Sequence, residues 1–255
     1  MKRTISGTSA FSKIMTAVPP AKTASYTPIA HNNVISAIRS EIAAAGYIIT
    51  DESYRSSNNG EVALGNFKIA YKSDPDIELA ANFVNSYNKM YAFRFNLGGM
   101  VKVCSNGMMI NNNKFGAYKR VHKGAADLLA KGKISSLIAD SGEYWDLLID
   151  HKQQLKDNML THTQKYSIIG EAYFNREIVS PHQMSIIKSE MAKPSFDYKV
   201  DPNSAWALYN HMTLALKDTH PATFIQDHTL LHEIFDNYIY LSPTIAIAEP
   251  EMETV

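Results

Sequence analysis

The sequence has a single cysteine, Cys104, and no apolar run long enough to cross a bilayer. One cysteine excludes an internal disulfide framework and any zinc or iron–sulfur site built from several thiolates. A membrane-spanning helix would need a run of about 18 apolar residues, so we expect no association with a membrane. No apolar stretch follows Lys2 and Arg3, so we also expect no secretory signal.

Glycine motifs that bind phosphates are absent as well. Neither Gly-x4-Gly-Lys-Ser/Thr nor Gly-x-Gly-x-x-Gly occurs, which argues against a nucleotide-hydrolysing recombinase and a dinucleotide-dependent enzyme. The composition is that of a globular protein, with 255 residues, 45% of them hydrophobic and 20% charged, and a formal net charge of zero. This length can bury a sizeable core, and the zero net charge argues against a uniformly basic coat protein.

Acidic residues are missing from one long stretch. From residue 79 to residue 126 there is no Asp or Glu, although the whole chain has 25 acidic and 25 basic residues. The same stretch contains seven basic residues: Lys89, Arg94, Lys102, Lys114, Lys119, Arg120 and Lys123. Strands disfavour acids, which would account for their absence but not for the basic residues. The asymmetry therefore points to an anionic partner.

Hydrophobic periodicity divides the chain into three parts. Residues 1–30, rich in Ser, Thr, Ala and Pro, predict a flexible arm, and residues 242–255 predict a disordered acidic tail. Residues 31–241 predict one α+β domain. It begins with a helix over 33–45, continues as an antiparallel sheet of hairpins over about 47–122, and ends in a helical half packed on one face of that sheet. The first strand-like runs cover 47–50, 61–71 and 78–87.

A hairpin is predicted inside the acid-free stretch. Alternation over residues 91–96 puts Phe93 and Phe95 on a core face and Arg94 on the opposite face. A Leu-Gly-Gly turn at 97–99 and an Asn-Gly turn at 106–107 would continue the meander. This register adds three further residues to the core face: Val101, Val103 and Ile110.

The opposite face of that hairpin carries the functional prediction. Arg94 would lie directly across from Lys102, with Asn111 beside it, and like charges opposed in a sheet are destabilising. Either acids of the C-terminal half supply the counter-charge or the face binds a polyanion through its phosphates. Nearby aromatic residues would then stack on bases: Tyr87, Tyr91, Phe115 and Tyr118.

The predicted nucleic-acid-binding residues follow from this face and from the basic run Lys-Arg-Val-His-Lys at 119–123, which is the best local candidate for phosphate contacts. A solvated charge run is the alternative for that segment. The predicted set is Lys89, Arg94, Lys102, Asn111, Lys114, Tyr118, Lys119, Arg120 and Lys123.

Other candidate centres are better explained as structure. Cys104 is predicted on a strand just before a turn, where a small packing residue is expected. His228 and His232 lie one helical turn apart and could share a metal with His211 or His220, but the metalloprotease pattern is absent and nine histidines make such spacing unsurprising. Three acids share a helix face that we expect to be solvated: Glu143, Asp146 and Asp150. We therefore predict no catalytic residue, no metal and no cofactor.

Several segments together carry a family resemblance: AAAGY, then DESYRSSNNGEVALGNF, then SYNKMYAFRFNLGGMVKVCSNGMMI, and later SAWALYNHMTLALKDTH. Over roughly residues 31–240 the chain resembles the phage- and plasmid-borne family catalogued as domain of unknown function 932. The signature is carried here by Ser86, Tyr87, Asn88, Lys89, Gly98, Val103, Cys104, Ser105, Asn106 and Gly107. The resemblance implies a mobile-element protein in a bacterial host cytoplasm, and it implies no catalytic residues.

These observations lead to one expected function and one alternative. We expect a non-enzymatic phage or plasmid protein that binds nucleic acid, in particular single-stranded DNA during recombination or replication, and that could form a homo-oligomer. The alternative is a mobile-element interaction protein, either an anti-defence factor or a virion component, whose basic face meets an acidic surface on a host or phage protein.

Overall fold

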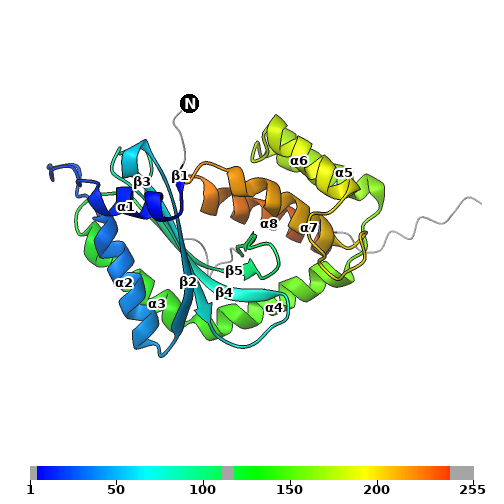
Figure 1. Cartoon of the computed structure of the whole chain (residues 1–255), viewed down its shortest axis with the longest axis horizontal. Helices are drawn as coiled ribbons and strands as arrows, with labels where there is room; N and C mark the ends of the chain where they lie inside the picture. Colours follow the sequence, from blue (N-terminus) through cyan, green and yellow to red (C-terminus); the bar gives the residue numbers. More distant parts are fainter. Residues whose placement is uncertain (1–4, 111–117, 242–255) are drawn as a thin grey trace, which may run out of the picture.

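The computed structural model describes residues 5–110 and 118–241 of the chain (Figure 1). Its strands are β1 (Ile5–Ser6), β2 (Ile48–Ser57), β3 (Val62–Ala70), β4 (Ile77–Ser86), β5 (Phe93–Val101), β6 (Gly107–Met108) and β7 (Tyr118–Arg120). Its α-helices are α1 (Thr8–Thr16), α2 (His31–Ala44), α3 (Ala126–Ala139), α4 (Ser141–Asp157), α5 (His162–Gly170), α6 (Pro181–Ala192), α7 (Ala205–Ala215) and α8 (Phe224–Leu241). Single turns of other helix types are η1 (Asn58–Gly60), η2 (Glu171–Asn175) and η3 (Leu216–Asp218).

An antiparallel sheet followed by a helical C-terminal half forms the molecule, which confirms the predicted α+β class. The strands follow the order β1-β2-β3-β4-β5-β6, and β7 also pairs with β5. One edge of β5 therefore lies along β4, and the other edge is shared by β6 at one end and β7 at the other. No helix in the described part of the chain is long and apolar enough to cross a membrane.

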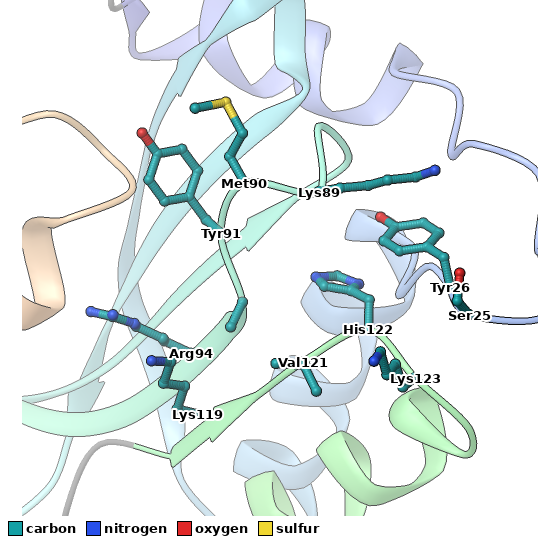
Figure 2. Close-up of a pocket in the computed structure, with 11 residues that line it drawn as sticks. Ser25, Tyr26, Lys89, Met90, Tyr91, Arg94, Lys119, Val121, His122 and Lys123 are labelled. Atoms are coloured by element: carbon teal, nitrogen blue, oxygen red, sulfur yellow. The ribbon is translucent and has the colours of Figure 1, made fainter.

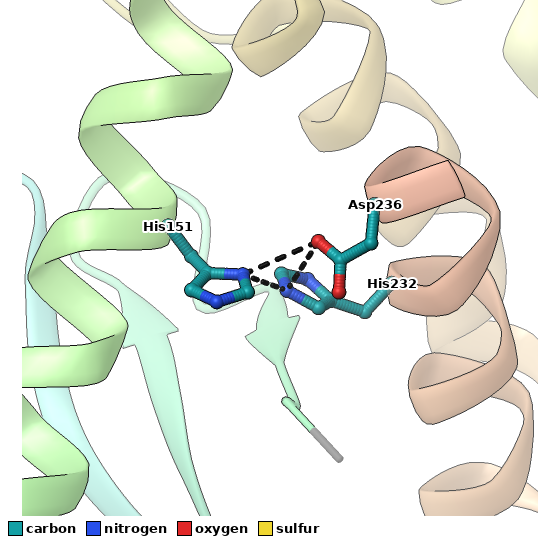
Figure 3. A group of neighbouring side chains, drawn as sticks. All are labelled: His151, His232 and Asp236. Atoms are coloured by element: carbon teal, nitrogen blue, oxygen red, sulfur yellow. Dashed lines mark hydrogen bonds and ion pairs between the residues drawn. The ribbon is translucent and has the colours of Figure 1, made fainter. Parts of the chain in front are cut away.

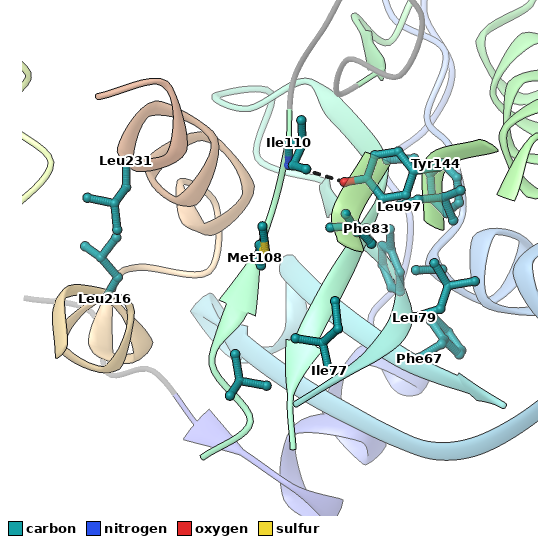
Figure 4. Close-up of a cluster of buried hydrophobic side chains, with 14 of the residues drawn as sticks. Phe67, Ile77, Leu79, Phe83, Leu97, Met108, Ile110, Tyr144, Leu216 and Leu231 are labelled. Atoms are coloured by element: carbon teal, nitrogen blue, oxygen red, sulfur yellow. Dashed lines mark hydrogen bonds between the residues drawn. The ribbon is translucent and has the colours of Figure 1, made fainter. Parts of the chain in front are cut away.

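Helices cover both faces of this sheet, whereas the sequence predicted one covered face. On the first face, the aromatic side chains of Phe67 and Phe83 are fully buried (Figure 4), as is that of Phe95, and α1 to α4 pack there. On the second face, Leu64 and Val84 are buried in a smaller cluster that includes Phe224 and Ile225 of α8. The apolar residues on this second face require a cover of their own, and the beginning of α8 provides it.

The predicted turn at 97–99 is wrong, because β5 runs straight through it. Gly98 pairs with Ala80 and Gly99 with Leu79 along β4. A Cβ atom on Gly98 would lie 3.0 Å from both the side-chain nitrogen of Asn82 and the carbonyl oxygen of Met108. Glycine is thus needed here for the close approach of neighbouring strands and not for a turn.

The predicted two-residue turn at 106–107 is also wrong, because a longer connection links β5 to β6. The N–H of Val101 donates to the carbonyl of Asn106 at 2.9 Å, and Gly99 pairs with Met108. Phe93, Phe95, Val101 and Ile110 are buried as predicted, but Val103 lies in the connection and is 49% exposed.

Residues 5–30 are ordered against the domain, so the predicted flexible arm is wrong over that range. Strand β1 pairs with β2, and Ala10 and Ile14 of α1 are buried in the main core. The arm lacked visible periodicity because α1 is only nine residues long and buries only two of them. The predicted tail at 242–255 lies outside the described residues.

Helix α2 forms close to the predicted range 33–45, and α3, α4, α6, α7 and α8 form where periodicity predicts helices, over 125–140, 142–160, 180–191, 201–217 and 227–238. Two differences from the predictions are instructive. The predicted strand at 47–50 extends to Ser57 as β2, whose buried residues are confined to its second half, at Tyr54, Ser56 and Ser57. Helix α5 was not predicted. It is short, yet a capping box closes its start, in which the Thr161 hydroxyl accepts from the N–H of Gln164 and the Gln164 side chain accepts from the N–H of Thr161.

Gly60 provides a test of how α1 docks on the sheet. Its φ is +94°, and a Cβ atom there would collide with the carbonyl group of Lys13 in α1. We expect Gly60→Ala to lower the free energy of unfolding by about 2 kcal/mol or more. Gly132→Ala, in open space on α3, should instead raise it by up to about 1 kcal/mol. Urea denaturation measures both, and equal stability of Gly60→Ala and wild type would contradict the docking of α1.

Candidate nucleic-acid interface

Four of the predicted basic residues line one hollow of about 570 Å³ at the β7 end of β5 (Figure 2). Lys89 comes from the loop before β5, Arg94 from the start of β5, Lys119 from β7 and Lys123 from the segment after β7. The pairing of β5 with β7 brings these segments together. These four of the predicted side chains thus share one hollow.

Two of the four cations lie directly opposite each other in the sheet. Arg94 pairs with Lys119 across the β5–β7 ladder, in place of the predicted partner Lys102. The guanidinium of Arg94 donates to the side-chain oxygen of Gln226 in α8 at 2.6 Å, which is a neutral partner. Such an arrangement of like charges is destabilising unless an anion offsets it.

Arg94 interacts electrostatically with one acid, Asp227, in the first turn of α8. Burial raises the pKa of Asp227 to about 6, and the charge of Arg94 works in the opposite direction. Burial lowers the pKa of Arg94, and Asp227 partly offsets that effect. Within the described part of the chain, no carboxylate forms an ion pair with Lys89, Lys119 or Lys123. Only Arg94 therefore has a counter-charge, and only a partial one.

A buried aromatic pair forms one wall of the hollow. The rings of Tyr26 and His122 stack with centroids 5.3 Å apart, and the ammonium of Lys89 lies 5.0 Å from the Tyr26 ring centroid. His122 is 5% exposed, and neither of its ring nitrogens has a hydrogen-bond partner among the described residues. Burial lowers the pKa of His122 and favours its neutral form, which can both donate to and accept from a ligand.

The rim of the hollow is apolar and open. Met90 is 71% exposed and Val121 is 54% exposed, and the half-buried ring of Tyr91 lies between the loop and α8. Tyr87, by contrast, is not available for stacking on a base. Its hydroxyl accepts from the N–H of His31 at 2.7 Å, and its ring stacks on His31 with centroids 3.8 Å apart.

Three other predicted site residues lie elsewhere. The ammonium of Lys102, at the opposite end of β5, donates to the carbonyl of Asp74 at 2.5 Å. Tyr118 and Arg120 pair with Phe95 and Phe93, so alternation turns both toward the first face of the sheet and away from Lys119. The remaining predictions lie outside the described residues: Asn111, Lys114 and Phe115.

Two members of the hollow were not predicted as site residues, Tyr26 and His122. His122 lies inside the basic run at 119–123, which is a usable signal. Tyr26 lies in the segment that was predicted to be flexible, and only the fold joins the two. The N–H of Thr27 donates to the carbonyl of His122 at 2.8 Å.

The histidines that were considered as a metal group from their spacing do not meet. His228 lies 3.1 Å from the Gly107 carbonyl, His220 lies 3.1 Å from the Ser57 hydroxyl, and His211 lies 3.8 Å from Glu190. His232 instead faces His151 and Asp236, on another side of α8 from the hollow.

Cys104 is buried, as expected of a packing residue. Burial raises the pKa of its thiol, which disfavours the nucleophilic thiolate. The acids predicted to form a solvated helix face are all exposed: Glu143, Asp146 and Asp150.

Comparison with known proteins gives no relative to set beside this geometry. No protein-family model matches the chain, and no curated protein or solved structure matches it. The resemblance to the domain of unknown function 932 therefore stays a prediction from the sequence motifs.

Two buried histidines predict how stability depends on pH. Burial lowers the pKa of His31 to about 4 and that of His228 to about 3, from 6.5. Below pH 6.5 the unfolded chain therefore binds protons that the folded chain excludes, so stability falls as pH falls, by about 1.4 kcal/mol per pH unit for each histidine. Asp227 has the opposite sign, since its raised pKa of about 6 adds stability as it becomes protonated between about pH 6 and 4.

The histidines outnumber this one acid, so we expect a net loss of at least about 1.4 kcal/mol per pH unit between pH 6 and pH 4. Urea unfolding at several pH values, followed by circular dichroism, measures the slope. A flat or rising profile in that range would show that these histidines are not buried in their neutral form.

Proposed function

We propose that this protein binds single-stranded DNA, without catalysing a reaction on it, through the hollow lined by Lys89, Arg94, Lys119 and Lys123. The observation that carries the proposal is the convergence of four cations on one recess whose lining contains no acid. Ordinary surfaces place lysines singly or beside carboxylates. Four cations, none of them in an ion pair among the described residues, create a field suited to phosphates.

The shape and lining of the hollow favour a single strand over a duplex. A recess of about 570 Å³ is of the size that holds small ligands, and a flexible strand can turn a phosphate and a base into it. The rigid rod of a duplex would rest on the rim. The apolar side chains of Met90 and Val121 and the ring of Tyr91 offer bases a surface without sequence preference.

The neutral imidazole of His122 also supports binding of single-stranded DNA, because burying a polar ring without a hydrogen-bond partner costs free energy. A ligand phosphate or base edge in the hollow would supply the missing hydrogen bond. The sequence resemblance to mobile-element proteins links such binding to recombination or replication in a phage or plasmid, and to the bacterial cytoplasm as its place.

Charge reversal in the hollow is the direct test. Lys119 and Lys123 are exposed, and among the described residues their ammonium groups form no hydrogen bond or ion pair whose loss would unfold the chain. We expect Lys119→Glu/Lys123→Glu to weaken binding of a fluorescent oligo-dT of about 15–20 nucleotides by at least tenfold at 50 mM salt. Fluorescence anisotropy gives the affinity, and circular dichroism confirms the fold.

The matched control is Lys188→Glu/Lys193→Glu, which makes the same change in net charge at one exposed position in α6 and one just after its end, away from the hollow. This control variant should bind oligo-dT less than threefold more weakly than the wild type does. Equal losses in the two double variants would show that net charge alone drives the binding, and would end the proposal for this hollow.

Salt dependence provides a second, independent number. Three or four phosphate contacts predict a slope of log affinity against log salt of about −2 to −3 for a single strand, and removing two contacts should reduce its magnitude by about 1.4. A wild-type protein that does not bind oligo-dT at 50 mM salt would refute DNA binding. The cations of the hollow would then favour the alternative function, docking of an acidic protein surface.

A further inference from the structure

His151, His232 and Asp236 form a compact group away from the basic hollow (Figure 3). His151 comes from α4, while His232 and Asp236 lie one turn apart on α8. The Nδ1 of His151 lies 3.0 Å from the Nε2 of His232 and 3.2 Å from the Oδ1 of Asp236. The Nε2 of His232 lies 3.4 Å from the same carboxylate oxygen.

These three distances match the edges of a metal coordination polyhedron. Nitrogen and oxygen ligands bind zinc-like ions at about 2.1 Å, which separates two ligand atoms by about 3.0 Å at a right angle and by about 3.4 Å at the tetrahedral angle. The observed edges of 3.0, 3.2 and 3.4 Å lie within that interval. One ion can therefore contact all three atoms without a rearrangement of the helices.

Hydrogen bonds alone satisfy the three ligand atoms poorly, because these atoms lie at the corners of a triangle. A proton on one edge of a nearly equilateral triangle points about 60° away from the third atom, where a hydrogen bond is weak. Both ring nitrogens can donate to the Asp236 carboxylate, at 3.2 and 3.4 Å, but the 3.0 Å contact between the two nitrogens then holds no proton, whereas one cation contacts all three atoms.

The surroundings resemble the outer shell of a metal site. The other ring nitrogen of His232, Nδ1, lies 3.3 Å from the hydroxyl of the buried Tyr209, an arrangement that fixes the ring orientation of a metal-binding histidine. Side-chain exposure rises from 1% at His232 to 13% at His151 and 25% at Asp236. The group is therefore closed toward the core at His232 and partly exposed to solvent at Asp236.

We propose that His151, His232 and Asp236 bind one divalent transition-metal ion of the zinc type, which clamps α4 to α8. Two imidazoles and one carboxylate suit Zn²⁺ and its first-row neighbours, whereas Mg²⁺ and Ca²⁺ prefer oxygen ligands alone. Because α4 covers the first face of the sheet and α8 covers the second, the ion joins the two covers. This proposal is independent of DNA binding.

Titration of the intact protein with Zn²⁺ in a calorimeter tests the site. We expect one ion per chain and a rise in Tm when Zn²⁺ is present, because an ion that binds only the folded state stabilises it. Asp236→Asn and His151→Gln should each weaken binding by about 100-fold or more, since each removes a ligand, whereas Tyr209→Phe should weaken it by about tenfold. Co²⁺ in place of Zn²⁺ should give visible absorption bands in the wild type that both ligand variants lose.

His182→Gln is the control, since His182 is an exposed histidine at the start of α6. It should leave the affinity for Zn²⁺ and the Co²⁺ spectrum unchanged. The proposal is overturned if the wild type takes up no Zn²⁺, or if Asp236→Asn and His151→Gln, with wild-type circular dichroism, bind it as tightly as the wild type. An equal loss in His182→Gln would show adventitious binding to surface histidines and would overturn it too.

Discussion

The pairing of β5 on both of its edges is the constraint on which the rest of this structure depends. Strand β4 occupies one edge along eight residue pairs, while β6 and β7 divide the other edge between them. Because both faces of the sheet are also covered, β5 cannot slip by one residue without moving its phenylalanines out of the core. The same register fixes Arg94 beside Lys119, so the position of the basic hollow follows from the packing of the core.

Periodicity and composition were enough to predict the α+β class, because they depend only on local alternation and on charge. They correctly placed Phe93 and Phe95 opposite Arg94, and the four cations of the hollow all lie in the acid-free stretch. The same reasoning failed at Gly98 and Gly99, which were predicted to form a turn. Two successive glycines suit a turn, but they also suit a strand that passes close to its neighbours, and only the tertiary contacts of Gly98 distinguish the two cases.

The members of the candidate site could be predicted only in part for the same reason. Lys102 was assigned beside Arg94 through a turn that does not form, and it lies at the far end of the strand. Tyr26 could not be predicted at all, because nothing near it in the sequence indicates the stacking on His122, 96 positions away. A site assembled from separate segments requires the register of the sheet, whereas its charge can be read from the sequence.

The metal ligands illustrate the limit of spacing as a signal. His228 and His232 have suitable helical spacing, yet His228 faces the Gly107 carbonyl and the ladder of the sheet. The useful pair on α8 is His232 with Asp236, and their third partner is 81 residues away on α4. Two ligands one helical turn apart point to the same side of their helix. A third ligand, from an opposing helix, completes the site only if the two helices are held at the right distance. Here the sheet between them sets that distance, so the core that orders the basic hollow also brings the three donor atoms together.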